Sequence, residues 1–175
     1  GDARGGRPHR SRGVSAPPGD PFRLDGQAAI VTGASAGLGA IMARGLARAG
    51  CAVLLAARRT AELEALAEEI RADGGRAAWR RADLRDPGHA EDLVGACRGE
   101  LGRLDGVVLN AGVAVQGPAE REDLGAFADV MAVNVTAHAA LAAAAARAMI
   151  PAGGGWMIAM SSILGRRAGT GPGVA

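Results

Sequence analysis

The 175-residue chain contains no tyrosine, and all 20 of its basic residues are arginine, so lysine is absent too. Any mechanism that takes a phenol or an ammonium group from this chain is therefore excluded. Cys51 and Cys97 are too few for a disulfide framework and indicate a reducing compartment, so we expect a cytoplasmic protein. No uninterrupted run of about 18 apolar residues occurs, which argues against a membrane span.

What is present suits one globular domain. Apolar residues make up 49% of the chain, which is too many for a disordered protein. The net charge of +2 resides in residues 1–20, because residues 21–175 hold 16 arginines and 16 acidic residues. Residues 1–20 are rich in arginine, glycine and proline and lack aromatic residues. We therefore expect a disordered tail there, with no secretory signal and no nucleic-acid partner.

Short apolar segments alternate with amphipathic helical patterns from residue 28 onward. The expected strands are 28–32, 52–57, 77–81, 106–110 and 156–161. The expected helices are 37–50, a segment capped by Thr60 and stopped at Gly74, a segment opened by Asp86 as N-cap and Pro87 at N1, and 122–150. This alternation predicts an α/β fold, a doubly wound parallel sheet between two helical layers. Ligands of such sheets bind at the carboxyl ends of the strands.

The first expected strand ends in a glycine-rich turn. The segment reads TGASAGLG over residues 32–39 and leads into a helix. Glycines allow a tight turn and close approach of the backbone to a ligand, and a helix N-terminus favours a pyrophosphate. The spacing is G-x-x-x-G-x-G rather than G-x-G-x-x-G, so an ordinary strand–helix turn is the alternative.

The second expected strand ends in Arg58 and Arg59, where dinucleotide folds carry either an acidic residue for a ribose hydroxyl or an arginine for a 2′-phosphate. The guanidinium group matches phosphate geometry, so the pair favours NADP over NAD. A solvated basic pair before a helix is the alternative. Asp83, after the third strand, could accept a hydrogen bond from an adenine amino group, or simply be a turn residue.

The remaining strand ends and one helix add polar candidates. Asn110-Ala111-Gly112 forms a small, flat segment after the fourth strand, and Ser162 follows the fifth. Asn134 lies within a helical pattern, an unfavourable place for asparagine, so it is expected to bind water or backbone at a site.

These segments together resemble the short-chain dehydrogenase/reductase family. The similarity rests on TGASAGLG at 32–39, the arginine after the second strand, Asp83-Leu84, Asn110-Ala111-Gly112, Asn134 and SSILG at 161–165, and it covers residues 22–175. The resemblance implies a Rossmann-type sheet, incomplete at about five strands, as an NADP-binding domain over 21–175. It also implies hydride transfer between NADP(H) and a small-molecule carbonyl or alcohol, with a homo-oligomeric full-length protein.

The resemblance assigns roles by position. The phosphates would be held by Gly33, Ser35, Gly37, Leu38 and Gly39, within a loop that begins at Thr32. Arg58, with Arg59, would hold the 2′-phosphate, and Asp83 and Leu84 would flank adenine. Asn110, Ala111 and Gly112 would line the nicotinamide end. Ser162 would be the catalytic serine that stabilises charge on the substrate oxygen, and Asn134 the catalytic asparagine that holds a water.

The family also needs a catalytic tyrosine and a lysine four positions later. The tyrosine is expected about 13 residues after the serine, and counting from Ser162 reaches Ala175, the last residue. We therefore expect this chain to lack the second half of the active site and to be inactive alone. The alternatives are a non-catalytic NADP-binding module and the product of a decayed gene.

The remaining reactive side chains have simpler interpretations. The two cysteines are expected to be buried and inert, and His138 to be a surface or packed histidine rather than a metal ligand. His89 is expected to be solvated at a helix start. No metal site is predicted.

Overall fold

The computed structural model describes residues 21–86, 88–115, 119–121 and 123–162, so the expected tail over 1–20 lies outside the described residues. The strands are β1 (Ala28–Thr32), β2 (Ala52–Ala57), β3 (Ala77–Arg81), β4 (Gly106–Leu109) and β5 (Trp156–Ala159). The α-helices are α1 (Gly37–Arg48), α2 (Thr60–Ala72), α3 (His89–Leu101), α4 (Leu124–Met131) and α5 (Ala137–Met149). The shorter helices are the 3-10 turns η1 (Ala119–Arg121) and η3 (Ile150–Ala152) and the π-helix η2 (Ala132–Thr136).

The strands form one parallel sheet in the order β3-β2-β1-β4-β5. The chain winds outward from β1 to β3 and then crosses back to β4, so the topological switch point lies between β1 and β4. Ligands of doubly wound sheets bind at that point, beyond the carboxyl ends of the strands. The predicted fold class is confirmed.

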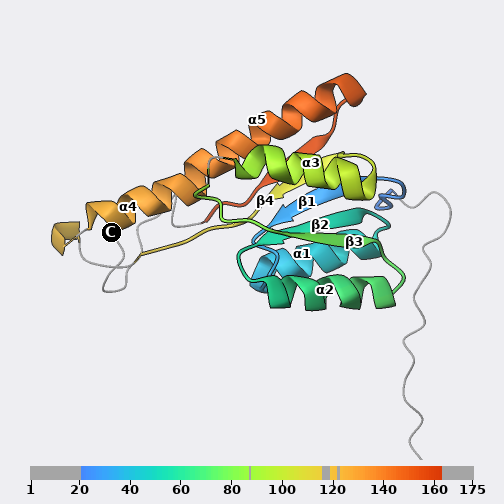
Figure 1. Ribbon diagram of the computed structural model, residues 1–175, viewed down its shortest axis with the longest axis horizontal. Helices are drawn as coiled ribbons and strands as arrows, with labels where there is room; N and C mark the ends of the chain where they lie inside the picture. The colour runs from blue at the N-terminus through green and yellow to red at the C-terminus, as the bar shows by residue number, and fades with distance from the viewer. Residues whose placement is uncertain (1–20, 87, 116–118, 122, 163–175) are drawn as a thin grey trace, which may run out of the picture.

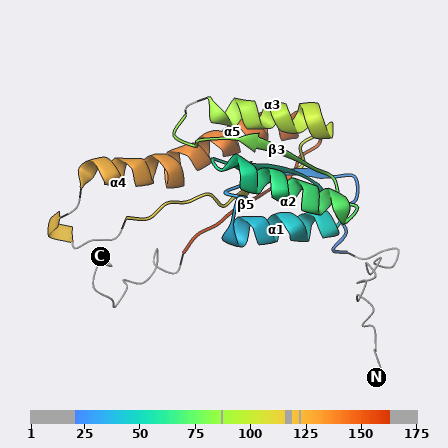
Figure 2. The ribbon, with the colours of Figure 1, turned by 60° about the horizontal axis from the view of Figure 1, so that its bottom comes forward.

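Helices cover both faces of the sheet, with α1 and α2 on one side and α3 and α5 on the other (Figure 1). Alternate strand residues divide between the two layers, as the two-residue period of a strand requires. Leu54 and Val107 pack with α3 and α5, whereas Val53 and Val108 pack with α1 and α2. Helix α4 continues beyond the sheet, with η1 at its outer end (Figure 2).

Two expected helix starts need correction. Helix α3 begins at His89 with Gly88 as its N-cap, so Asp86 does not cap it. The Asp86 carboxylate instead accepts a hydrogen bond from the Gly88 amide at 2.9 Å, which closes a local turn before the helix. Thr60 is the first residue of α2 rather than its cap, and Arg59 occupies the N-cap position.

His89 was expected to be solvated, and the structure shows that this is wrong. Its side chain is buried where the start of α3 meets α5. The ring nitrogens contact two backbone oxygens, Nδ1 with Asp86 at 2.6 Å and Nε2 with Ala137 at 3.3 Å. Residues 89 and 137 are far apart in sequence, so only the packing of α5 on α3 reveals this burial.

The long helical region is one continuous run with a π-helical centre. Leu124–Ala152 spans 29 residues and is long and apolar enough, by length and composition, to cross a membrane. The expected absence of a membrane-length apolar segment is therefore corrected, because this helix reaches that length and mean hydropathy without an uninterrupted apolar run. A core helix passes the same test when most of it is buried. Here α5 packs Leu141 and Ala145 into the core with α3, but only 17% of the most apolar stretch of the long helix is buried among the described residues.

Both cysteines are buried, as predicted. The exposed fraction of the residue is 1% for Cys51 and 0% for Cys97. Burial raises the pKa of each thiol to about 12, and the nearby Asp105 carboxylate adds to the effect. A thiol with so high a pKa carries almost no thiolate at neutral pH, so neither cysteine is a nucleophile in the folded chain.

These thiols predict a loss of stability at alkaline pH. Their folded pKa lies above the ordinary value of 9.0, so their contribution is complete below pH 9 and is lost as the pH rises from 9 to about 12. Each thiol should lower the free energy of unfolding by up to about 1.4 kcal/mol per pH unit in that window. Urea unfolding across it should show a flatter pH dependence for the Cys51→Ala/Cys97→Ala variant. Equal slopes would contradict the assignment.

Candidate functional site

A cavity of about 490 Å³ opens at the carboxyl ends of the strands, over the switch point. Its volume is in the range of small-molecule and cofactor sites. Its lining is Gly33, Ser35, Ala36, Leu38, Gly39, Ala56, Ala57, Arg58, Arg59, Ala82, Asp83, Leu84, Asn110, Ala111, Gly112, Val113 and Val133. Every predicted cofactor residue is in this set except Thr32 and Gly37.

Thr32 lies beneath the cavity and ties β1 to β4. Its side chain is fully buried, and its hydroxyl donates to the Val108 carbonyl at 3.2 Å. The same oxygen accepts from the amides of Asn110 at 3.0 Å and Ala111 at 3.1 Å. The Asn110 side-chain amide returns a bond to the Thr32 carbonyl at 3.0 Å. Thr32 thus holds the cavity floor in place instead of facing a ligand.

Two glycines are required by close approach of the backbone. Gly33 has a φ of +67°, and a Cβ there would lie 2.9 Å from both Ala111 Cα and Asn110 Nδ2. A Cβ on Gly39 would lie 2.6 Å from Asn110 Nδ2 and collide with the Gly33 carbonyl. The first turn of α1 can therefore pack against the β4 segment only because these positions lack side chains.

Within the part of the chain that the structure describes, no side chain caps the N-terminus of α1. Its N-cap residue is Ala36, and its first turn contains no acidic residue. In α4, by contrast, the Asp123 carboxylate accepts from the Gly125 amide at 2.8 Å. The first-turn amides of α1 and the positive end of its dipole thus remain available to an anion in the cavity.

The two arginines after β2 have different surroundings. Arg59 donates from Nε and Nη2 to Ser35 Oγ at 3.2 and 3.1 Å, and its Nη1 lies 3.3 Å from Glu62 Oε1. Arg58 is exposed and has no ion pair or hydrogen bond to any residue in the described part of the chain. Arg58 is therefore a cation at the cavity wall without a protein counter-ion among those residues.

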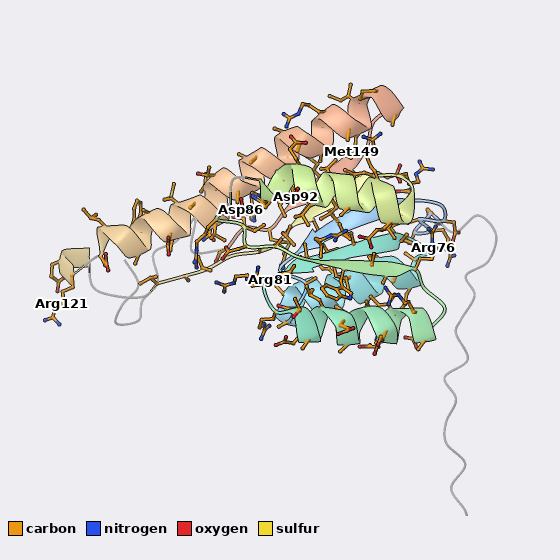
Figure 3. The ribbon with its side chains drawn as sticks, in the orientation of Figure 1. Arg76, Arg81, Asp86, Asp92, Arg121 and Met149 are labelled. Carbon is orange, nitrogen blue, oxygen red and sulfur yellow. The ribbon has the colours of Figure 1, made fainter. Side chains whose placement is uncertain are left out.

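Asp83 and Leu84 lie on the cavity wall beyond β3, and both are half-buried. The Asp83 Oδ1 atom accepts from the Arg85 amide at 3.1 Å, which makes an Asx-type turn. Its second carboxylate oxygen has no hydrogen bond within the described residues. Leu84 packs against the core beside α3. Figure 3 labels Arg81, which ends β3 just before this turn.

Asn134 lies in the π-helix η2 and binds backbone. Its Oδ1 accepts from the Val113 amide at 2.9 Å, and its Nδ2 donates to the Val113 carbonyl at 2.8 Å. Of the two expected partners, water or backbone, the side chain engages backbone. This pair of bonds fixes the segment after Gly112 against the helix, and π-helical turns often occur at functional sites.

Ser162 leaves the sheet beside the Asn110 segment. Strand β5 pairs with β4, and the Met160 amide donates to the Leu109 carbonyl at 2.9 Å. Ser161 and Ser162 follow β5 and are exposed. Ser162 does not line the cavity, but it emerges at the same edge of the sheet as Asn110, one strand away.

His138 is packed against the end of β4, which agrees with the predicted surface or packed histidine. Its Nε2 atom is buried with no hydrogen-bond partner among the described residues, and the ring lies near the backbone of Ala111. Burial is the main cause that lowers the pKa of this ring from its ordinary value. No motif signals this contact, because it depends on how α5 lies against the end of β4.

The described residues contain no group of three or more histidine, cysteine, aspartate or glutamate side chains that could hold a metal ion. The arrangement instead combines a glycine turn, an uncapped helix N-terminus, a free arginine and an asparagine clamp at the switch point of a parallel sheet. These features define the dinucleotide-binding class of α/β folds.

Comparison with known proteins identifies the family within this class. The family model described as short chain dehydrogenase matches residues 27–173. The chain therefore belongs to the short-chain dehydrogenase family, as the sequence motifs indicated.

Several relatives illustrate the match. An uncharacterized oxidoreductase of Mycobacterium tuberculosis (strain CDC 1551 / Oshkosh) is 43% identical over 153 residues, which cover 87% of this chain and 58% of that protein. A crystal structure of a short-chain type dehydrogenase/reductase from Mycobacterium marinum has a TM-score of 0.84 at 36% identity. It covers 88% of this chain and 63% of that one.

A gluconate 5-dehydrogenase from Burkholderia cenocepacia J2315, solved in complex with NADP and tartrate, has a TM-score of 0.80 at 31% identity. The match covers 88% of this chain and 60% of that structure. The chain thus spans about three fifths of the length of these relatives.

Proposed function

We propose that this chain forms the NADP(H)-binding part of a short-chain oxidoreductase that acts on a small-molecule alcohol or carbonyl compound. The proposal rests mainly on one observation. One cavity at the switch point is lined both by Arg58, which has no protein partner in the described residues, and by the uncapped N-terminus of α1. One offers a guanidinium to a 2′-phosphate and the other offers amides to a pyrophosphate. The relative solved with NADP supports the choice of cofactor.

The residues present fit this cofactor along the whole cavity. Gly33 and Gly39 would keep the backbone close to the phosphates, and Asp83 would use its free carboxylate oxygen toward adenine. Asn110, held by Thr32, would border the nicotinamide end. When bound, NADP(H) supplies or accepts a hydride. Ser162, emerging one strand from Asn110, would donate a hydrogen bond to the substrate oxygen.

Removing Arg58 tests the cofactor preference. Arg58→Ala should weaken NADPH binding by about 10- to 100-fold, because hydrogen bonds to charged groups contribute about 1.5–3 kcal/mol. NADH, which lacks the 2′-phosphate, should bind almost unchanged. Titration of the nicotinamide fluorescence measures both dissociation constants.

Arg76→Ala is the matched control, because it removes the same charge from an exposed arginine. Arg76 directly precedes β3, at the amino end of the strand and away from the cavity (Figure 3). It should leave both constants unchanged. An equal loss for NADPH and NADH in Arg58→Ala would reject the assignment of Arg58 to the 2′-phosphate.

We further propose that these 175 residues bind the cofactor without turning it over, because the sequence has neither the tyrosine nor the lysine that the family uses. A non-catalytic NADP-binding module would behave in the same way. The two functions differ in the reading frame beyond Ala175. A Tyr-x-x-x-Lys motif there supports the enzyme, whereas a genuine stop supports the module.

A further inference from the structure

Adjacent arginines at the cavity wall are used differently. All three guanidinium nitrogens of Arg59 have protein partners, Ser35 Oγ for Nε and Nη2 and Glu62 Oε1 for Nη1. Arg58, one residue earlier, has none of these contacts among the described residues. A hydroxyl oxygen has two lone pairs and can accept both bonds from one guanidinium fork. The side chains of Arg59 and Ser35 thus join the end of β2 to the glycine turn.

Arg59 is well placed to restrain that turn. It occupies the N-cap position of α2, a fixed point on the scaffold, and its pair with Glu62 in the first helical turn orients the guanidinium. Ser35 lies between Gly33 and Gly37, both at positive φ, in a segment whose glycines give it unusual freedom in the unfolded chain. A side-chain anchor on Ser35 lowers the cost of ordering this turn for a ligand.

We propose that Arg59 is a positioning residue that holds the glycine turn through Ser35, and that Arg58 alone recognises the 2′-phosphate. This inference rests on the proposed function and divides the roles that the sequence assigned to the pair together. The turn faces the pyrophosphate, which NADPH and NADH share. Loss of Arg59 therefore weakens both dinucleotides by the same factor, whereas loss of Arg58 weakens NADPH alone.

The test compares dissociation constants of NADPH and NADH for six proteins: the unaltered chain, Arg58→Ala, Arg59→Ala, Arg59→Lys, Ser35→Ala and the Ser35→Ala/Arg59→Ala double variant. Arg59→Ala should raise both constants by about 2- to 10-fold, the range for a lost hydrogen-bonded contact, and leave their ratio unchanged. The double variant should bind no more weakly than Arg59→Ala, since both substitutions remove the same contact. Arg59→Lys, which can still donate to Ser35, should recover part of the loss.

Two results would overturn the inference: a change in the NADPH/NADH ratio for Arg59→Ala like that for Arg58→Ala, or additive losses in the double variant. Amide hydrogen exchange without cofactor provides a second readout, and Arg59→Ala should speed exchange over residues 33–39 but not in α5. If the unaltered chain binds neither dinucleotide, the proposed function fails. The exchange rates then decide the role of Arg59, and unchanged rates reject it.

Discussion

Replacing Gly39 by alanine should lower the free energy of unfolding by about 1–3 kcal/mol, the usual range for overpacking a close contact. Gly39 is buried in the first turn of α1, and a Cβ there would lie 2.6 Å from Asn110 Nδ2. The added methyl group must displace either the Gly33 carbonyl or the Asn110 amide, which is bonded to Thr32. Because the displaced groups form the cavity floor, NADPH binding should fall below detection.

Gly45→Ala provides the matched control in the same helix. A Cβ at Gly45 would meet nothing within 4 Å, and the residue lies in the middle of α1. Alanine there should stabilise the chain by about 0.5–1 kcal/mol, because it restricts the unfolded backbone. Urea unfolding of the two variants measures the difference. Equal stability of Gly39→Ala and Gly45→Ala would show that the contact between α1 and the β4 segment is not tight.

Replacing Thr32 by valine should cost about 2–4 kcal/mol, although the two side chains have nearly the same shape. The hydroxyl accepts from the amides of Asn110 and Ala111, and a buried donor left without a partner costs about 1–3 kcal/mol. Valine removes both acceptor contacts at once. The freed segment should also bind cofactor more weakly, because Asn110 and Ala111 line the cavity.

Thr32→Ser separates the hydroxyl from the methyl group. It keeps the three hydrogen bonds of the hydroxyl and loses one buried methyl, which costs about 1 kcal/mol. Thermal or urea unfolding should therefore rank the serine variant close to the unaltered chain and the valine variant far below it. The reverse order would mean that packing, not hydrogen bonding, is what Thr32 provides.

Much of the scaffold could be predicted because its signals are local. The first three strands have the expected bounds, since apolar runs between glycines and charged residues mark buried strands. Helix α3 begins two residues after the predicted Pro87, because Asp86 forms a turn with Gly88 instead of a cap. The burial of His89 depends on contact with α5, which no local pattern encodes.

The sequence predicted which residues line the candidate site, but not the contacts that these residues make. Strand ends, glycines and arginines identified most of the cavity lining, because parallel strands bring their carboxyl ends together. The contacts that shape the site join residues at least 21 positions apart. They are the bonds of the buried Thr32 to the β4 segment, of Arg59 to Ser35 and of Asn134 to Val113. Each of these side chains has several possible hydrogen-bond partners in the folded chain. The spacing of residues in the sequence does not show which partner it bonds.

The cavity between the glycine turn, Arg58 and the Asn110 segment is proposed to bind NADP(H). The most direct test titrates NADPH into the 175-residue chain while amide signals are followed by nuclear magnetic resonance. We expect saturable one-to-one binding, competition by 2′,5′-ADP, weaker binding of NADH, and shifts concentrated at residues 33–39, 58–59 and 110–113. A folded chain whose amides in those segments do not respond to NADPH would contradict this proposal.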